Sequence, residues 1–235
     1  MSKLFSFQRM LTIFIDYRQF FLDGVKTTIM LSLVAVLFGT ILGGLLAVLR
    51  MYGPKIVRWI AVSYIEIIRS TPLMVQVMII YTFTGAMGFK FPPMFGIKNF
   101  STLAWGLLAV SMNSAAYVAE IVRGGINAVD PGQMEAARCL GMNKSMALRH
   151  IILPQAIKNI LPSLANEFVT MIKETSILNM IGVGELMFRA GDVVSITYRG
   201  LEAYVIAAIL YFIIVFPLSK LVAWYERRLN KSGTR

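Results

Sequence analysis

Long apolar runs recur along the chain, separated by short polar stretches that contain glycine, proline and charged residues. Each run exceeds the roughly 20 residues that a helix needs to cross the hydrocarbon core of a bilayer. Backbone groups inside a bilayer must be paired internally, which favours helices for runs of this kind. We therefore predict an all-α, polytopic membrane protein with five transmembrane helices, at about residues 25–49, 59–83, 102–122, 156–183 and 201–224.

The two ends of the chain differ from this apolar middle. Residues 1–21 mix phenylalanine and other apolar residues with charged ones, a pattern typical of a helix that lies in the membrane interface. They lack the apolar core and cleavage site of a signal peptide. We expect an amphipathic lead over residues 1–21, a transmembrane domain over 22–225 and a basic cytoplasmic tail over 226–235.

Composition narrows the class of protein further. The 235 residues are 57% hydrophobic and only 15% charged, which is too apolar for a soluble domain of this size. The formal charge of +11 would suggest nucleic acid in a soluble protein, but no basic and aromatic stripe that stacks bases is visible. We assign this charge to the flanks of membrane spans. Cys139 is the only cysteine and His150 the only histidine, so neither a disulfide nor a Cys- or His-based metal site is expected.

The second span is interrupted by the sequence Ser70-Thr71-Pro72. A proline inside a span leaves a backbone carbonyl without its donor, and in lipid this is tolerated only where protein or a wet cavity supplies a partner. The interruption is therefore either a simple kink or a break that contacts substrate. In the same helix, Glu66 and Arg69 lie three residues apart, close enough to pair.

The third span carries polar side chains at helical spacing. Asn113, Tyr117 and Glu120 share one face of the predicted helix. Arg123 follows Glu120 by three residues, so we expect a structural ion pair near the end of the span.

The fourth span is the most polar of the five. Ser163, Glu167, Thr170 and Glu174 step by four, three and four residues and form one stripe. A surface helix of a soluble protein would look similar. In a chain this apolar, the stripe favours a helix that faces an internal aqueous path.

Two other segments give simpler predictions. Gly39 and Gly43 form a GxxxG pair in the first span, which would let another helix approach closely. Residues 182–200, between the last two spans, are expected to form a polar loop.

A polar, basic interruption separates the third and fourth spans. Asp130 is a plausible helix N-cap, with Gln133 placed as in a capping box. Gly141 suits the left-handed position that follows a helix, and Asn143 suits the cap of a second short helix that Pro154 would limit. By themselves these residues predict two short helices at a corner, as in a surface helical hairpin.

The same interruption resembles the EAA loop that marks the membrane subunits of ABC importers. The matching residues lie within residues 130–154 and are Glu135-Ala136-Ala137, Gly141 and Ile151-x-Leu153-Pro154. Three further stretches resemble permeases of the polar amino acid family, of the histidine, glutamine, glutamate and arginine type: Arg69–Leu73, Ala116–Ile126 and Ile172–Ser176. The resemblance implies the type I ABC importer permease fold, with a short pair of cytoplasmic coupling helices that dock on an ATPase.

The resemblance also implies the partners. ATP and Mg would be bound by a separate ATPase subunit, and this chain, which lacks the G-x-x-x-x-G-K-[ST] phosphate loop, is expected to be neither an enzyme nor a cofactor-binding protein. Further expected partners are a second permease copy, an extracytoplasmic solute-binding protein, the lipid bilayer and an amino acid substrate, with no nucleic acid. The implied location is the bacterial cytoplasmic (inner) membrane. The distribution of Lys and Arg independently predicts that the EAA-like loop and the C-terminus are cytoplasmic and the N-terminus outside.

Two sets of site residues follow. The residues assigned to ATPase coupling are Glu135, Ala136, Ala137, Gly141, Ile151, Leu153 and Pro154. The residues assigned to the substrate path are Glu174, Ser70, Thr71, Pro72, Glu167, Thr170, Asn113 and Tyr117. Within the path, Glu174 is the candidate partner of a cationic group, and backbone N–H groups around Ser70 and Thr71 are the candidates for a carboxylate. In the alternative, Glu174 only stabilises the bundle by pairing with Lys173 or Arg69.

Three other functions remain open at this point. An ABC importer for another small solute would share the EAA-like loop. An ion-coupled secondary transporter is expected to show paired discontinuous helices in two related halves, whereas no internal repeat is visible. A membrane scaffold without a transport path predicts that the polar stripe of the fourth span is dispensable for uptake.

Overall fold

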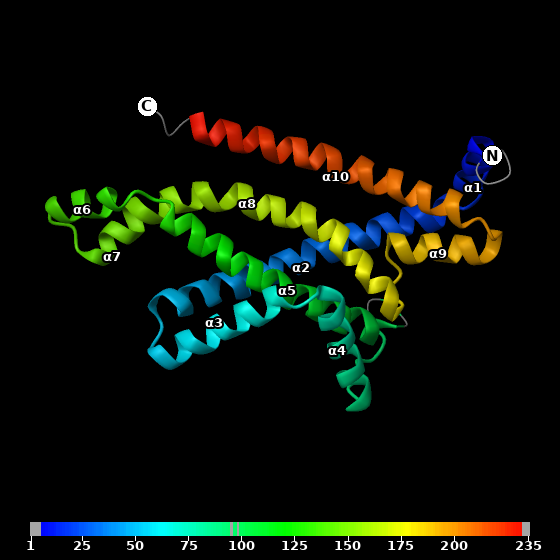
Figure 1. Cartoon of the computed structure of the whole chain (residues 1–235), viewed down its shortest axis with the longest axis horizontal. Coiled ribbons are helices and arrows are strands. Elements are labelled where there is room, and N and C mark those ends of the chain that lie inside the picture. The colour runs from blue at the N-terminus through cyan, green and yellow to red at the C-terminus, as the bar shows by residue number, and fades with distance from the viewer. Residues whose placement is uncertain (1–5, 95, 98, 232–235) are drawn as a thin grey trace.

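The computed structural model describes residues 6–94, 96, 97 and 99–231, and within these the chain is a bundle of helices without a strand (Figure 1). The helices are α1 (Phe7–Asp16), α2 (Arg18–Tyr52), α3 (Lys55–Ser70), α4 (Leu73–Ala86), α5 (Phe100–Asn127), α6 (Pro131–Cys139), α7 (Lys144–Ala147), α8 (Leu153–Glu174), α9 (Leu186–Thr197) and α10 (Gly200–Lys231). The short helices α6 and α7 project at one end of the molecule, and α1 and α9 lie at the other.

The pair α2 and α5 forms the centre of the bundle because two glycines let their backbones meet. A Cβ atom on Gly39 would come within 2.6 Å of Ser114 Oγ, and one on Gly43 within 2.6 Å of the Ala115 carbonyl oxygen. Both glycines are buried. The predicted role of the GxxxG pair in helix packing is therefore confirmed. The contacts follow the same order along both helices, so α2 and α5 run parallel.

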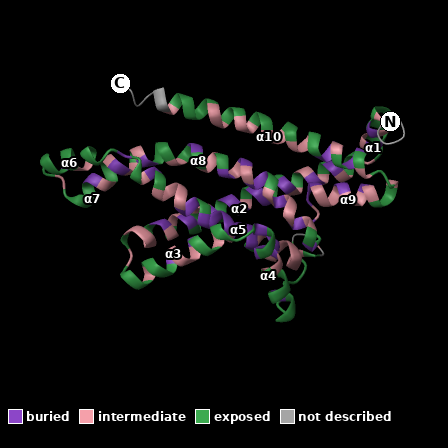
Figure 2. Cartoon of the chain, in the orientation of Figure 1, coloured by how far each residue is buried: buried purple, intermediate pink, exposed green. Residues whose placement is uncertain are grey.

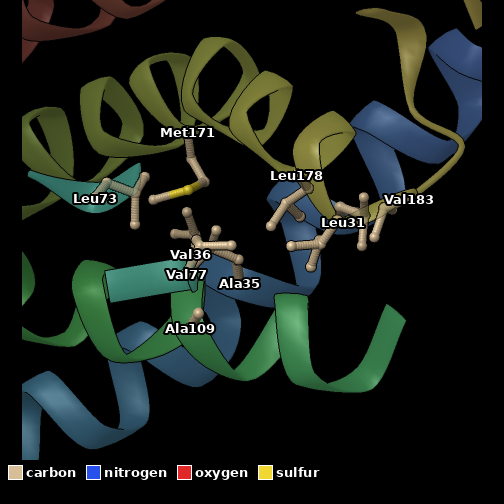
Figure 3. Close-up of a cluster of buried hydrophobic side chains, with 11 residues drawn as sticks. Leu31, Ala35, Val36, Leu73, Val77, Ala109, Met171, Leu178 and Val183 are labelled. Atoms are coloured by element: carbon tan, nitrogen blue, oxygen red, sulfur yellow. The ribbon is translucent and has the colours of Figure 1, made fainter. Parts of the chain in front are cut away.

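The largest buried apolar cluster joins four long helices. Figure 3 shows Leu31, Ala35 and Val36 of α2 meeting Leu73 and Val77 of α4, Ala109 of α5, Met171 of α8, and Leu178 and Val183 beyond it. Burial is concentrated where these helices cross, whereas α6, α7 and the C-terminal half of α10 are largely exposed (Figure 2). Through this cluster the start of α4 packs against α5 and residues 175–181, which follow α8.

The second predicted span is not one helix. It divides into α3 and α4, which meet at an angle of 109° around Thr71 and Pro72. Three helices of the described chain, α2, α5 and α10, are each long and apolar enough to cross a membrane, and the bent pair would make four. The helix α8, which also contains Gln155, Lys158 and Asn159, is not in this set, so the predicted number of five spans is not confirmed by length and composition.

The prediction of a polar loop over residues 182–200 was wrong. Glu185 caps α9 there, since its side chain accepts hydrogen bonds from the backbone N–H groups of Met187 and Phe188 at 2.9 and 2.7 Å. Leu186, Ala190 and Val193 on its inner face are buried against α1, α2 and α10. The α-helix of the predicted fourth span ends at Glu174 and continues as a 3-10 helix to Ile181.

The predicted N-terminal lead contains α1 and the beginning of α2. Met10 and Ile13 of α1 are buried against the cluster that α9 and α10 form, while Phe7, Leu11 and Ile15 are exposed. This two-sided pattern agrees with an amphipathic helix. Its placement in a membrane interface stays a prediction.

Candidate functional site

The break between α3 and α4 is stabilised by side chains rather than by the backbone. Pro72 has no N–H to donate to the carbonyl of Ile68, four residues earlier. The Gln76 side chain replaces that donor, with Nε2 at 2.7 Å from the Ile68 carbonyl oxygen and at 3.0 Å from that of Thr71. The Thr71 hydroxyl donates to the Ile67 carbonyl oxygen at 2.9 Å. The break is thus a defined structural feature in which the carbonyl groups of Ile67, Ile68 and Thr71 accept side-chain hydrogen bonds.

A polar network extends from this break into α5. Asn113 is 3% exposed, and its Nδ2 donates to Gln76 Oε1 at 3.0 Å. In the described chain its Oδ1 is buried without a hydrogen-bond donor. Asn113 was predicted as a path residue, whereas Gln76 was missed. The available signal for Gln76 was a buried polar residue one helical turn after the proline.

The stripe of the fourth span reaches both α5 and a polar cavity. Glu167 is 8% exposed and accepts a hydrogen bond from Ser114 Oγ at 3.0 Å. On its other side, Glu167 lines a cavity of about 450 Å³ between α5, α8 and α10, together with Ser163, Asn166, Ser219 and Glu226. Because hydroxyl, amide and carboxylate groups line this space, it fits the predicted aqueous path.

Glu174 is the last residue of α8. Met171, three residues earlier, packs in the same buried cluster as Leu73, the first residue of α4 (Figure 3). Glu174 and Thr170 are each half-buried. No salt bridge joins Glu174 to Lys173 or Arg69 in the described part of the chain, where the partner of Arg69 is Glu120. The pairing considered as an alternative role for Glu174 is therefore not observed.

Glu120 is surrounded by three arginines. It accepts from Arg123 Nη2 at 2.6 Å, which confirms the predicted ion pair. It also contacts Arg50 of α2, and Arg69 of α3 approaches to 3.8 Å. The predicted pair of Glu66 with Arg69 was wrong.

The packing of α3 explains this choice of partner. Ile65 is buried against Ala47 and Ala119, and Arg69 lies four residues later on the same helix face. That face points toward α5, where the Arg69 guanidinium also lies over the Tyr117 ring at 5.6 Å. Glu66, one residue after Ile65, is turned to the exposed side.

The local geometry of the EAA-like loop follows the predicted caps and turn. Asp130 Oδ1 accepts from the Gly132 N–H at 2.7 Å, and Asn143 Oδ1 accepts from the Met146 N–H at 2.9 Å. Gly141 has a φ of 81° between α6 and α7, as predicted. The capping box was wrong, because the side chain of Gln133 accepts from Gln155 Nε2 at 3.2 Å instead.

Pro154 does not limit the second short helix as predicted. Residues 144–174 form one continuous helical run, in which α7 passes through a π-helical turn at Leu148–Ile152 into α8. The Leu153 N–H reaches back five residues to the Leu148 carbonyl oxygen, and this wider turn lies immediately before Pro154. The N–H that Pro154 lacks does not end the helix, because Pro154 lies in the first turn of α8 and directly follows a π turn.

The helix α6 and the π-helical turn that follows α7 share a small apolar cluster of their own. Ile151 packs with Met134 against the buried residues Val129, Ile152 and Ala156. Of the other assigned coupling residues, Ala137 is buried, Leu153 is half-buried, and Glu135, Ala136, Gly141 and Pro154 are exposed. Leu140, which the sequence reasoning missed, is 83% exposed at the tip of the loop.

Known proteins with similar sequences and structures cover almost the whole chain. The putative glutamine transport system permease protein of Rickettsia conorii is 43% identical over 210 residues, which is 89% of this chain and 93% of that protein. The arginine transport system permease protein of Bacillus subtilis is 38% identical over 213 residues, covering 91% and 94% of the two chains. The crystal structure of an amino acid ABC transporter with histidines contains a chain that is 43% identical, with a TM-score of 0.86 over 95% of this chain and 99% of that one.

These similarities confirm the predicted all-α ABC permease fold. They select a permease over a secondary transporter or a scaffold, and they place ATP hydrolysis on a separate subunit. The family model for the inner membrane component of binding-protein-dependent transport systems matches residues 35–231. The chain therefore belongs to this family, as a non-catalytic membrane subunit of an ABC transporter.

Proposed function

We propose that this chain forms the translocation path of an ATP-driven importer for polar amino acids. The observation that carries the proposal is the continuous helical run over residues 144–174. One end of this run belongs to the exposed coupling helices. The other end carries Glu174, three residues after Met171, which shares a buried cluster with Leu73 at the start of α4. This run would link the two places at which an ATPase and a solute act.

The polar groups of the path suit a zwitterionic solute. An amino acid needs partners for both of its charges, because burying either one unpaired is costly. Glu174 would receive the cationic group, and backbone N–H groups at Ser70 and Thr71 would approach the carboxylate, as broken helices do in other transporters. The buried Asn113 and the half-buried Thr170 lie on the helices that flank this region. The relatives named for glutamine and arginine transport support the amino acid class.

The coupling surface would be formed by Glu135 and Ala136 on the exposed side of α6 and by Leu140 just after it, with Gly141 setting the corner. A separate ATPase subunit, which binds ATP and Mg, would grip this surface. Closure of two ATPase subunits would pull two such surfaces together, which requires a second permease copy. A solute-binding protein would deliver the amino acid from outside. The switch works only if solute and nucleotide bind the inward and outward states with different affinities.

The proposed location is the bacterial cytoplasmic membrane, with the coupling helices and the C-terminus in the cytoplasm and the N-terminus outside. The two ends of the described chain lie at opposite ends of the molecule, and the C-terminal end lies on the side of α6 and α7 (Figure 1). Since α2 and α5 run parallel, the chain must cross the membrane an even number of times between the start of α2 and the start of α5. The proposed orientation has two such crossings, by α2 and by the α3–α4 pair. The basic residues near α6, α7 and the end of α10 agree with the same orientation.

Purification of this chain with its native partners provides the test. The complex, reconstituted with its binding protein, should hydrolyse ATP faster when a transported polar amino acid is added, and uptake should require ATP. Faster hydrolysis with only a sugar, a metal or another small solute would refute the amino acid class. Uptake by the chain alone, driven by an ion gradient, would refute the ATP-driven mechanism.

A further inference from the structure

The cluster around Glu120 holds more positive than negative charge. Arg50, Arg69 and Arg123 all lie within ion-pair distance of one carboxylate, which leaves two positive charges in excess. Arg69 is near the end of α3, roughly 21 Å along the helix from Lys55 at 1.5 Å per residue. An excess of positive charge among membrane helices is expected to attract an anionic partner, because unpaired charge is costly there.

Arg69 differs from the other two arginines in how it contacts Glu120. Arg123 donates two hydrogen bonds to this carboxylate, at 2.9 and 2.6 Å, and Arg50 donates one. The Nη1 atom of Arg69 stays at 3.8 Å, beyond hydrogen-bond distance. The other side-chain contact described for Arg69 is its stacking over the Tyr117 ring.

The guanidinium of Arg69 is therefore held in position while its N–H donors remain available to another acceptor. It presents five N–H donors in a planar fork that matches a carboxylate. Its side chain is 43% exposed, compared with 22% for Arg50. Stacking on Tyr117 and attraction to Glu120 restrict its position without occupying those donors. This arrangement is a receptor for a second carboxylate.

The place of Arg69 in the fold connects this receptor to the proposed path. Ser70, Thr71 and Pro72, the residues of the break, follow it directly, and all three are exposed. Gln76 and Asn113 hold the same break from the other side. A solute at the break would meet Arg69 before any other free cationic donor of α3, since Lys55 and Arg58 lie at the opposite end of that helix.

We propose that Arg69 binds the carboxylate of the transported amino acid, with Glu120 and Tyr117 as positioning residues. This inference rests on the proposed function and extends it, because a fixed charge replaces the partial charges of backbone N–H groups as the main partner of the carboxylate. Charge-assisted, bidentate hydrogen bonds are the stronger interaction.

Binding of matched ligand pairs tests this role. The complex of permease and ATPase, without binding protein and in nanodiscs of phosphatidylethanolamine, is titrated with L-arginine and agmatine, and with L-glutamine and 4-aminobutanamide. Each pair differs only in the carboxylate. The wild type should prefer the carboxylated member by about tenfold or more, the value expected for a charged hydrogen bond.

Three variants separate binding from stability. Arg69→Gln should bring the two members of a pair to nearly equal affinity, and Glu120 keeps Arg50 and Arg123 as partners in this variant. Arg69→Lys keeps the charge but not the fork, so it should retain part of the preference. Arg58→Gln, the same change at an exposed position in the first turn of α3, should keep the wild-type preference.

The outcomes distinguish this inference from the proposed function. An unchanged preference in Arg69→Gln, or in Arg69→Lys if Arg69→Gln does not assemble, would overturn the role of Arg69 and leave amino acid transport standing. A wild type that binds neither member of either pair, and whose ATPase no amino acid stimulates, would overturn both. A loss of copurifying phosphatidylglycerol in Arg69→Gln without a change in preference would assign Arg69 to a lipid headgroup and overturn the role proposed here.

Discussion

Replacement of Gln76 by leucine should weaken the fold at the α3–α4 break. Gln76 is 7% exposed, and its amide is the only described side chain that bonds both the Ile68 carbonyl and Asn113. Leucine has a similar size but no polar atoms, so the variant keeps the packing and leaves these two groups, and the Thr71 carbonyl, without their partner.

The magnitude follows from the number of groups left unpaired. Each buried group that loses its partner costs about 1–3 kcal/mol in mutational data. Hydrogen bonds between membrane helices contribute less, on average about 0.6 kcal/mol and up to about 1.7 kcal/mol. Three groups are affected, namely the carbonyls of Ile68 and Thr71 and the Asn113 amide, so we expect Gln76→Leu to lower the free energy of unfolding by roughly 1–3 kcal/mol.

Reversible unfolding of the purified permease in detergent micelles measures this change. Thr82→Val is a matched control on the same helix, because Thr82 is exposed and its hydroxyl bonds only carbonyl groups of its own helix. It should change the unfolding free energy by less than about 0.5 kcal/mol. A double-mutant cycle with Asn113→Leu should give a coupling energy above about 0.5 kcal/mol. Equal stability of Gln76→Leu and wild type, or an additive cycle, would refute the account of the break given above.

Three further predictions concern coupling, topology and the path. Gly141→Val should strain the left-handed corner by roughly 1–2 kcal/mol or more and impair ATPase docking, whereas Gly44→Ala, in open space, should leave it intact; normal copurification with the ATPase would contradict the coupling role. Cys139, the sole cysteine and exposed, should react with a membrane-impermeant thiol reagent only from the cytoplasmic side, so labelling of intact cells would reverse the proposed orientation. Glu174→Gln should weaken amino acid-stimulated transport while preserving assembly and basal ATPase activity, and an unchanged transport affinity would remove Glu174 from the path.

The features that the sequence predicted correctly depend on short-range physics. The caps by Asp130 and Asn143 involve backbone groups two or three residues away, and the conformation of Gly141 is set by its lack of a Cβ atom. The pair of Glu120 and Arg123 lies within one helical turn. Such interactions can be predicted from the sequence because they do not depend on where distant segments of the chain lie.

The predictions that failed depend on what surrounds a residue. The sequence offered Glu66 and Glu174 as possible partners of Arg69. Burial of Ile65 on one face of α3 turned Arg69 toward Glu120 instead. Pro154 was predicted to end a helix. The helix continues because the π turn before Pro154 accommodates its missing N–H. Residues 182–200 looked polar, although a buried Glu185 cap and three inward apolar residues make them a packed helix.

The sequence alone determined the helical membrane class, the site of the coupling helices and the place where the second span breaks, because bilayer thickness, capping and proline geometry act locally. Only the tertiary structure decided the 109° angle of that break, the bond from Gln76 to Asn113 and the three arginines that meet at Glu120. These depend on helix crossings set by Gly39 and Gly43 and by the apolar cluster of Figure 3, which bring together residues that lie far apart along the chain.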